Sequence, residues 1–174
     1  MCVVANCIPL LIQQNVDGSN FFNRSWAEFK VGFNDSGGNF WLGNDLVSQL
    51  TANNRRYKLR FDLQSRSNTS NWYSAEYSTF RVLSEADNYQ LKVAGYSGNA
   101  GYDAMAYHND RMFTTYDRDN DQSSSRNCAV FRCSGFWYSD CALCSVNGAT
   151  GHFYWAYLPG GNHLQSSRMW LQCK

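Results

Sequence analysis

In the stretch Tyr57-Lys58-Leu59-Arg60-Phe61-Asp62-Leu63, apolar and polar residues alternate strictly. Because successive side chains of a β-strand point to opposite faces, this pattern predicts a strand with one buried face. Downstream, residues 72–82 and 89–94 repeat the strand pattern, and the segment 84–88 between them has the composition of a turn. Together the three segments predict an antiparallel meander.

Two short helices are expected before this meander. The first is expected to begin after Ser25, which has the side chain of a helix cap. The second is expected over residues 43–51, with Asn44 or Asp45 as its cap and an apolar face made by Leu46, Val47 and Leu50. After the meander, glycine, asparagine, aspartate and serine dominate, which predicts long ordered loops. These elements indicate an α+β fold.

Size and charge limit the possible functions of the protein. With 174 residues it is expected to form one domain. Its formal net charge is +1 and its longest basic run is Arg55-Arg56, so the positive surface of a nucleic-acid-binding protein is missing. The sequence also has no stretch of about 20 apolar residues, so no membrane span is expected.

The cysteines indicate an oxidising, extracellular location. There are seven, and four of them lie close together: Cys128, Cys133, Cys141 and Cys144. Sequons at Asn23, Asn34 and Asn68 are compatible with a secreted glycoprotein. The first 12 residues are apolar but have no basic start and contain Asn6 and Pro9, so they make a poor signal peptide. We expect either that a leader lies upstream or that the sequence is a shortened form.

From about Asp17 to Met169 the sequence resembles the fibrinogen C-terminal domain shared by fibrinogen, ficolins, tachylectins and angiopoietins. The resemblance depends on several strings that occur in the family's order. They are Asp17-Gly18-Ser19, residues 38–45 (Gly-Asn-Phe-Trp-Leu-Gly-Asn-Asp), residues 77–82, 89–91 and 95–101, Tyr107-His108-Asn109, residues 113–121, Asn127-Cys128-Ala129, residues 135–138 with Cys141, and Asn147-Gly148.

The family implies a twisted antiparallel sheet with short helices and a loop-rich region that holds calcium and a ligand. Its N-terminal subdomain has no counterpart before Leu11. We therefore expect residues 1–14 to be a divergent or truncated segment and residues 15–174 to form the fibrinogen-related domain.

A calcium loop is predicted around Asp117, Asp119 and Asp121, because hard cations prefer oxygen ligands. The spacing differs from an EF-hand, since glycine is absent at the sixth position and Cys128 stands at the twelfth. The resemblance implies that the carboxylates of Asp119 and Asp121 bind the ion, together with the main-chain carbonyls of Ser123 and Ser125. Asp117 would be an outer, structural partner. Arg126 is an alternative to Ser125, because the loop is one residue longer than usual. The affinity is expected to be on the order of 0.1 to 1 mM.

The resemblance also pairs Cys128 with Cys141 in a disulfide. Cys133 and Cys144 are additional and are expected to form a second, parallel bridge. A zinc site made by the four cysteines is an alternative, because residues 141–144 have Cys-x-x-Cys spacing. Cys173 is expected to pair with Cys2 or Cys7, or to link to another subunit.

In lectin-like members of the family, the ligand pocket lies beside the calcium loop and behind this disulfide. The corresponding ligand-binding residues here are Arg132, Asp140, Ala142 and Trp155, although a place in the aromatic core is the favoured interpretation of the Trp155 ring. Arg132 stands where acetyl-binding members usually have tyrosine, and Ala142 stands where many members have histidine. Asp140 precedes Cys141 at a place where the family often has a cis peptide. Arg132 would suit an anionic ligand.

The histidines lie in no nucleophile motif and beside no paired carboxylate in sequence, so an enzyme is not expected. His108 is interpreted as structural. The favoured function is a secreted, calcium-binding recognition domain of lectin type for acetylated or acidic glycans. The alternative is a protein-interaction module that binds a peptide or receptor. Homo-oligomers could form through an upstream region.

Overall fold

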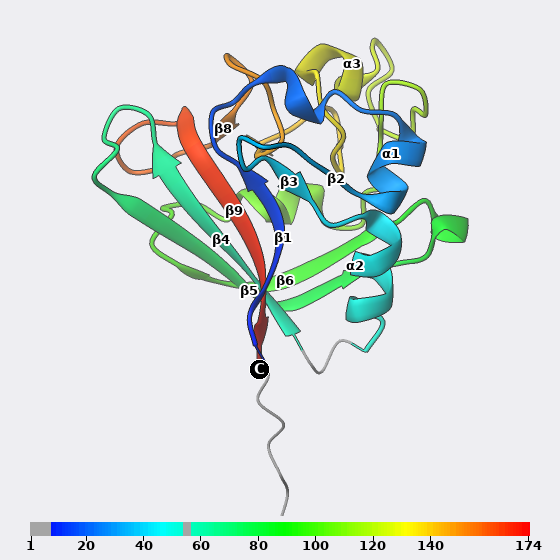
Figure 1. The fold of residues 1–174 in the computed structure, drawn as a ribbon, viewed down its shortest axis with the longest axis horizontal. Coiled ribbons are helices and arrows are strands. Elements are labelled where there is room, and N and C mark those ends of the chain that lie inside the picture. Colours follow the sequence, from blue (N-terminus) through cyan, green and yellow to red (C-terminus); the bar gives the residue numbers. More distant parts are fainter. Residues whose placement is uncertain (1–7, 54–56) are drawn as a thin grey trace, which may run out of the picture.

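The computed structural model describes residues 8–53 and 57–174. Seven strands within these residues form one sheet, in which every pair of neighbours is antiparallel and the order is β2-β3-β1-β9-β4-β5-β6 (Figure 1). The strands are β1 (Leu10–Asn15), β2 (Phe33–Asn34), β3 (Phe40–Trp41), β4 (Tyr57–Ser65), β5 (Trp72–Val82), β6 (Leu91–Gly98) and β9 (Leu164–Cys173). The hairpin of β7 (Cys144–Ser145) and β8 (Tyr154–Trp155) forms a separate small sheet.

Short helices complete the α+β fold that the sequence predicted. The α-helices are α1 (Trp26–Val31), α2 (Asn44–Thr51) and α3 (Cys128–Arg132), and the 3-10 helices are η1 (Asn20–Phe22), η2 (Glu85–Asp87) and η3 (Ala104–His108). None of the helices in the described part of the protein has the length and apolar character needed to cross a lipid bilayer. β1 crosses the boundary expected between residues 14 and 15 and pairs with the last strand, β9.

The predicted meander is present as β4, β5 and β6. Along β4, buried and half-buried residues alternate from end to end, and β5 has the predicted limits. β6 begins two residues later than expected, because Asn88 and Tyr89 both have left-handed backbone, with φ values of 51° and 50°. The turn therefore continues through Tyr89, whose ring is fully buried.

The two N-terminal helices start in different ways. Ser25 caps α1 in a reciprocal arrangement: its Oγ accepts from the Glu28 N–H at 3.3 Å, and a Glu28 carboxylate oxygen accepts from the Ser25 N–H at 2.8 Å. The cap of α2 is Gly43, which corrects the expectation of Asn44 or Asp45. Those two side chains accept hydrogen bonds from the Trp41 indole and the Tyr89 hydroxyl instead.

The apolar face predicted for α2 is smaller than expected, because 42% of Leu46 is exposed while Val47 is buried. The helices and long loops lie to one side of the sheet (Figure 1). Much of the core between them is aromatic and includes the fully buried Phe29, Phe61, Phe113, Trp41, Trp137 and Trp155. This aromatic core supports the loops that form the candidate site.

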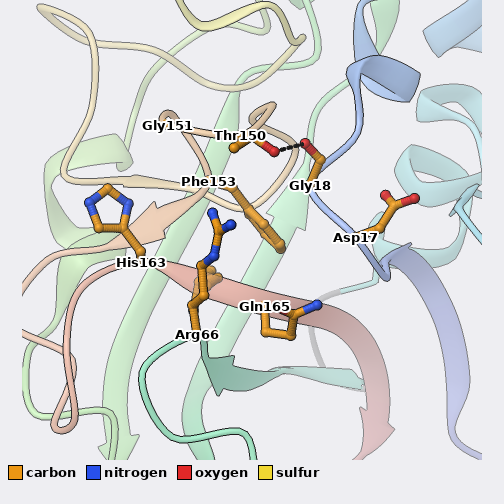
Figure 2. Close-up of a pocket in the computed structure, with 9 residues that line it drawn as sticks. Asp17, Gly18, Arg66, Thr150, Gly151, Phe153, His163 and Gln165 are labelled. Carbon is orange, nitrogen blue, oxygen red and sulfur yellow. Dashed lines mark hydrogen bonds between the residues drawn. The ribbon is translucent and has the colours of Figure 1, made fainter.

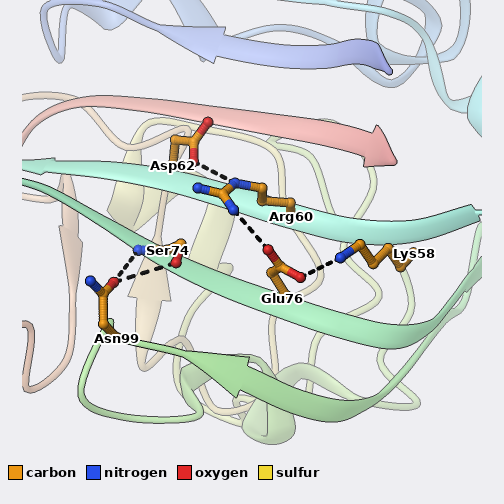
Figure 3. A network of polar contacts seen from close by, with 6 residues as sticks. All are labelled: Lys58, Arg60, Asp62, Ser74, Glu76 and Asn99. Carbon is orange, nitrogen blue, oxygen red and sulfur yellow. Dashed lines mark hydrogen bonds and ion pairs between the residues drawn. The ribbon is translucent and has the colours of Figure 1, made fainter. Parts of the chain in front are cut away.

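Charged side chains from β4 and β5 form a network on the sheet (Figure 3). Arg60 lies between Asp62 at 2.8 Å and Glu76 at 2.7 Å, and Lys58 also pairs with Glu76. The hydrogen bond from Lys58, helped by Arg60, lowers the pKa of Glu76. Such half-exposed pairs add little stability individually, but they give this part of the sheet a polar surface.

Candidate functional site

The predicted calcium loop is attached to α1 through Asp117. One carboxylate oxygen of Asp117 accepts from the backbone N–H of Trp26 at 2.9 Å and from the Thr115 hydroxyl at 2.7 Å. Its hydrogen bonds therefore hold the beginning of the loop against the beginning of the helix. This is the geometry of a structural partner.

Asp119 and Asp121 lie next to each other further along the loop. Oδ1 of Asp119 accepts from the Asp121 N–H at 3.3 Å. Asp121 accepts two backbone hydrogen bonds, from Ser123 at 2.8 Å and from Cys128 at 2.7 Å. The pKa of Asp121 is nevertheless raised, chiefly because the carboxyl group is partly buried and also because Asp119 is negatively charged. A positive charge beside both carboxylates would remove this penalty.

The remaining oxygens of the predicted set lie in the same turn. Ser123 is half-buried and Ser125 is exposed, and their hydroxyl oxygens are 3.4 Å apart. The described residues contain no group of three or more histidine, cysteine or acidic side chains arranged for a metal. Two carboxylates supplemented by main-chain carbonyls are a donor set of hard oxygens, which fits calcium and does not fit a soft metal.

The disulfide between Cys128 and Cys141 braces this loop. It closes a separation of 13 residues and joins the first residue of α3 to the loop that follows residue 139. A second link lies nearby, where the backbone N–H of Gln122 donates to the carbonyl of Ser139 at 3.0 Å. The pairing is the one that the resemblance implied.

The expected second bridge is absent, because Cys133 and Cys144 are both free. Cys133 is half-buried just after α3, whereas Cys144 is fully buried with its sulfur 3.4 Å from that of Met105. Burial raises the pKa of the Cys144 thiol well above its usual value. The zinc alternative also fails, since the sulfurs of Cys128 and Cys141 are bonded to each other.

Cys173 is in a disulfide bond. The residues predicted as its partner, Cys2 and Cys7, lie outside the described residues.

Beside the predicted calcium loop, Arg126, Phe131 and Arg132 form a stack that we call the cationic cleft wall. The guanidinium carbons of Arg126 and Arg132 lie 4.8 and 4.9 Å from the centre of the Phe131 ring. An open cleft of about 400 Å³ runs along Arg126 and Phe131 of this wall and is lined by Ser125, Arg126, Asn127, Val130 and Phe131, whereas Arg132 is not among its lining residues. One wall of the cleft therefore continues directly from the predicted calcium loop.

Arg132 has hydrogen-bonding capacity that the structure does not use. Its Nη1 lies 3.2 Å from Nδ1 of His152, while its Nε is buried without a hydrogen-bond partner among the described residues. Burial and the charge of Arg132 lower the pKa of His152, so this imidazole is neutral and accepts from the guanidinium. Phe131 and His152 were not predicted as site residues, and Arg126 was expected only as an alternative carbonyl donor of the calcium loop. The fold gathers these side chains around Arg132.

Asp140 and Ala142 flank the disulfide and are held through their backbones. The carbonyl of Asp140 accepts from the Tyr107 hydroxyl at 3.2 Å, and that of Ala142 accepts from the Tyr154 hydroxyl at 2.6 Å. No cis peptide bond occurs among the described residues, so the family's cis bond before Cys141 is not found here. Cys141 instead has a positive φ of 55°.

Trp155 is the one predicted ligand-binding residue that the structure moves into the core. It is fully buried, its indole N–H donates to the carbonyl of Tyr102 at 3.2 Å, and its ring packs 5.1 Å from that of Phe61. A ligand on the surface cannot touch this ring, so the core interpretation of Trp155 holds and its assignment as a ligand-binding residue is wrong.

His108 is buried beneath the disulfide loop and has a structural role, as the sequence predicted. It is fully buried, and its Nδ1 lies 2.7 Å from the carbonyl of Trp137, to which it donates. Nε2 accepts from the backbone N–H groups of Leu143 and Cys144 at 3.2 and 3.3 Å. Burial lowers the pKa of His108 to about 4, so the ring is neutral at physiological pH. These bonds position the backbone on both sides of the disulfide loop.

Comparison with protein families gives one match that runs over almost the whole sequence. Residues 6–172 match the model described as "Fibrinogen beta and gamma chains, C-terminal globular domain". The protein is 40% identical over 161 residues to fibrinogen-like protein A of Apostichopus parvimensis and 38% identical over 163 residues to ficolin-3 of Homo sapiens. These matches cover 87% and 88% of this sequence but 55% and 53% of the relatives, so it spans about half their length.

Solved structures agree with the sequence match. The fibrinogen-like globe domain of human ANGPTL2 superposes with a TM-score of 0.83 at 35% identity, over 94% of this protein and 79% of that domain. Lamprey fibrin D-dimer, complexed with the peptide Gly-His-Arg-Pro-amide, superposes with a TM-score of 0.78 at 29% identity, over 92% of this protein and 60% of that one.

Proposed function

Because the protein belongs to the family of C-terminal globular domains found in fibrinogen β and γ subunits, we propose that it is an extracellular, non-catalytic recognition domain that binds acidic or acetylated glycans with the help of calcium. The observation that carries this proposal is the cationic cleft wall beside the paired carboxylates of the calcium loop.

The cleft favours an anionic ligand. Arg126 and Arg132 place two guanidinium groups around one aromatic ring, and neither is in an ion pair with a described carboxylate. Guanidinium groups bind carboxylates and phosphates through paired hydrogen bonds. Among the two glycan classes, the acidic one therefore fits these residues better than the acetylated one.

Calcium would act by ordering the wall of the cleft. Asp119 and Asp121, with the main-chain carbonyls of Ser123 and Ser125, are the residues that would hold it, and the bound ion would supply a fixed positive charge. The hydrogen bond from the Cys128 N–H to Asp121 links the carboxylates to α3, and Ser125 belongs to both the loop and the cleft. Order in the loop would therefore be transmitted to the surface that touches the ligand.

The test is a glycan array that contains acidic, acetylated and neutral glycans, probed with and without a calcium chelator. Calcium-dependent binding of acidic glycans, lost in Asp121→Asn and in Arg132→Gln, is the expected result. Binding that is unchanged by the chelator and unchanged in Arg132→Gln would contradict the proposal. Asp87→Asn is a suitable control, since Asp87 is an exposed carboxylate whose contact is with Ser84.

A protein-interaction module is the second candidate, and one observation favours it. Val130 and Phe131 are 58% and 41% exposed along the same cleft, so a peptide could place an apolar side chain there. The lamprey fibrin structure named above contains a peptide ligand. Capture of a peptide or receptor by a protein that is silent on the glycan array would favour this alternative.

A further inference from the structure

A second pocket lies away from the cleft, where the end of β4 meets the beginning of β9 (Figure 2). It encloses about 110 Å³, and the residues that matter here are Gly18, Arg66, Thr150, Phe153, His163 and Gln165. In Figure 1 this end of β4 and β9 is well separated from α3, and the pocket shares no lining residue with the cleft. It is therefore a distinct site.

Two cation-forming side chains line this pocket without a partner. The backbone N–H of Arg66 donates to the carbonyl of His163 at 2.8 Å, which brings the two residues together across neighbouring segments. Within the described residues, neither the Arg66 guanidinium nor the His163 imidazole has a hydrogen bond or an ion pair. By contrast, Lys58, Arg60 and Lys92 all pair with carboxylates.

Asp17 also lines the pocket, but its carboxylate makes no ion pair with Arg66. Its Oδ1 accepts from the backbone N–H of Ser19 at 2.9 Å and from the amide of Asn39 at 3.5 Å. In Figure 2 the Asp17 carboxylate lies on the far side of Phe153 from Arg66. The guanidinium therefore keeps its full capacity for an anion from solution.

Hydrogen bonds between Thr150 and Gly18 order the opposite wall of the pocket without a ligand. The backbone N–H and the hydroxyl of Thr150 both donate to the carbonyl of Gly18, at 2.6 and 3.0 Å. Gly18 has a φ of +64°, and a Cβ there would lie 2.9 Å from the ring of Phe153, so only glycine fits. Next to Thr150, a Cβ on Gly151 would meet no atom within 4 Å, which marks the open side. A ligand would enter a preformed site and would not have to order it.

We propose that this pocket binds the carboxylate of an acidic sugar, independently of calcium. Arg66 pairs with the carboxylate through two parallel hydrogen bonds, and His163 adds a further donor. The amide of Gln165 and the hydroxyl of Thr150 face sugar hydroxyls, while the ring of Phe153 covers an apolar edge. The lining is mostly polar, which suits a sugar better than the apolar side chain of a peptide terminus. This site goes beyond the proposed function, because it lies outside the calcium loop and the cleft.

The experiment is a nuclear magnetic resonance titration of the ¹⁵N-labelled protein with glucuronate in the presence of EDTA. We expect saturable shifts of the amide signals of Gly18, Thr150, Gly151 and Leu164. Glucose, which is the neutral match, and acetate, which has the carboxylate alone, are expected to shift these signals far less. Arg66→Gln should weaken glucuronate binding about tenfold or more, while Arg81→Gln, an exposed arginine of β5, should have no effect.

Three results would overturn the assignment: equal shifts with glucose or acetate, unchanged affinity in Arg66→Gln, or loss of binding in Asp121→Asn. The last variant also separates this proposal from the proposed function, because it disables the calcium loop alone. Arg66 is exposed, so its variant is expected to fold, and unchanged signals far from the pocket verify this.

Discussion

The Cys128 N–H donates to Oδ2 of Asp121 at 2.7 Å, so the residue that begins α3 and forms the disulfide also holds a carboxylate of the calcium loop. One hydrogen bond thus connects the disulfide to the proposed calcium site. We therefore expect loss of the disulfide to weaken calcium binding. The first two predictions follow from this contact.

Asp121→Asn should weaken calcium binding about tenfold, because it removes one of two charged ligands. If calcium binds with a Kd of about 1 mM, then about 10 mM calcium should stabilise the parent protein by about 1.4 kcal/mol. Calorimetry and thermal unfolding with and without calcium measure both effects. Asp87→Asn should behave like the parent. No heat and no melting shift with the parent protein would rule out the calcium site.

Removal of the Cys128 to Cys141 disulfide by a double serine substitution should lower the free energy of unfolding by about 3 kcal/mol, because the bridge restrains a loop of this length in the unfolded state. Calcium affinity should fall as well. Urea unfolding measures the stability. Cys133→Ser is the matched control, since that cysteine is free, and a loss of similar size there would contradict the assignment of the bridge.

Trp155→Phe should destabilise the protein by about 1 to 3 kcal/mol and leave ligand binding unchanged. The substitution removes the indole N–H that donates to the partly buried carbonyl of Tyr102, and it replaces a fully buried ring by a smaller one. Unfolding by urea and the glycan array measure the two properties. Loss of glycan binding in a variant that remains folded would show that Trp155 belongs to the site after all.

Stability should fall on mild acidification through His108. Its pKa is about 4 in the folded protein and about 6.5 when unfolded, so the unfolded state binds more protons between these values. The contribution of neutral His108 to the free energy of unfolding is complete above pH 6.5. It is lost progressively down to pH 4, by up to about 3 kcal/mol. Urea unfolding from pH 7 to pH 4.5 measures the slope.

Replacing His108 separates its effect on the pH dependence of stability from the effect of the carboxylates, which titrate at lower pH. His108→Gln should be less stable at pH 7 and should have a flatter profile above pH 4.5. His163→Gln, at an exposed position, is the control and should retain the slope of the parent. An unchanged slope in His108→Gln would refute the role of the buried imidazole.

Local patterns were enough to predict β4, β5, the cap of α1 and the α+β class. Each of these depends on residues close in sequence, such as the alternation along β4 and the pair Ser25 and Glu28. The start of α2 was wrong because Asn44 and Asp45 have partners at Trp41 and Tyr89. No local rule distinguishes a capping side chain from one that is used in tertiary contacts.

The candidate site was only partly predictable for the same reason. The resemblance identified the loop residues and the pairing of Cys128 with Cys141. It could not show that Cys144 packs against Met105 rather than Cys133. The second pocket could not be predicted, because Arg66 and His163 are far apart in sequence and meet only when β9 aligns with β4.

The position of β9 between β1 and β4 has a consequence for biosynthesis. Residues 164–173 leave the ribosome after the other strands, yet they occupy the middle of the sheet. Until then β1 and β4 have no common neighbour, and their edges are exposed to other proteins. The sheet can be completed only after this segment has been translated. The nascent polypeptide therefore needs protection from aggregation until then.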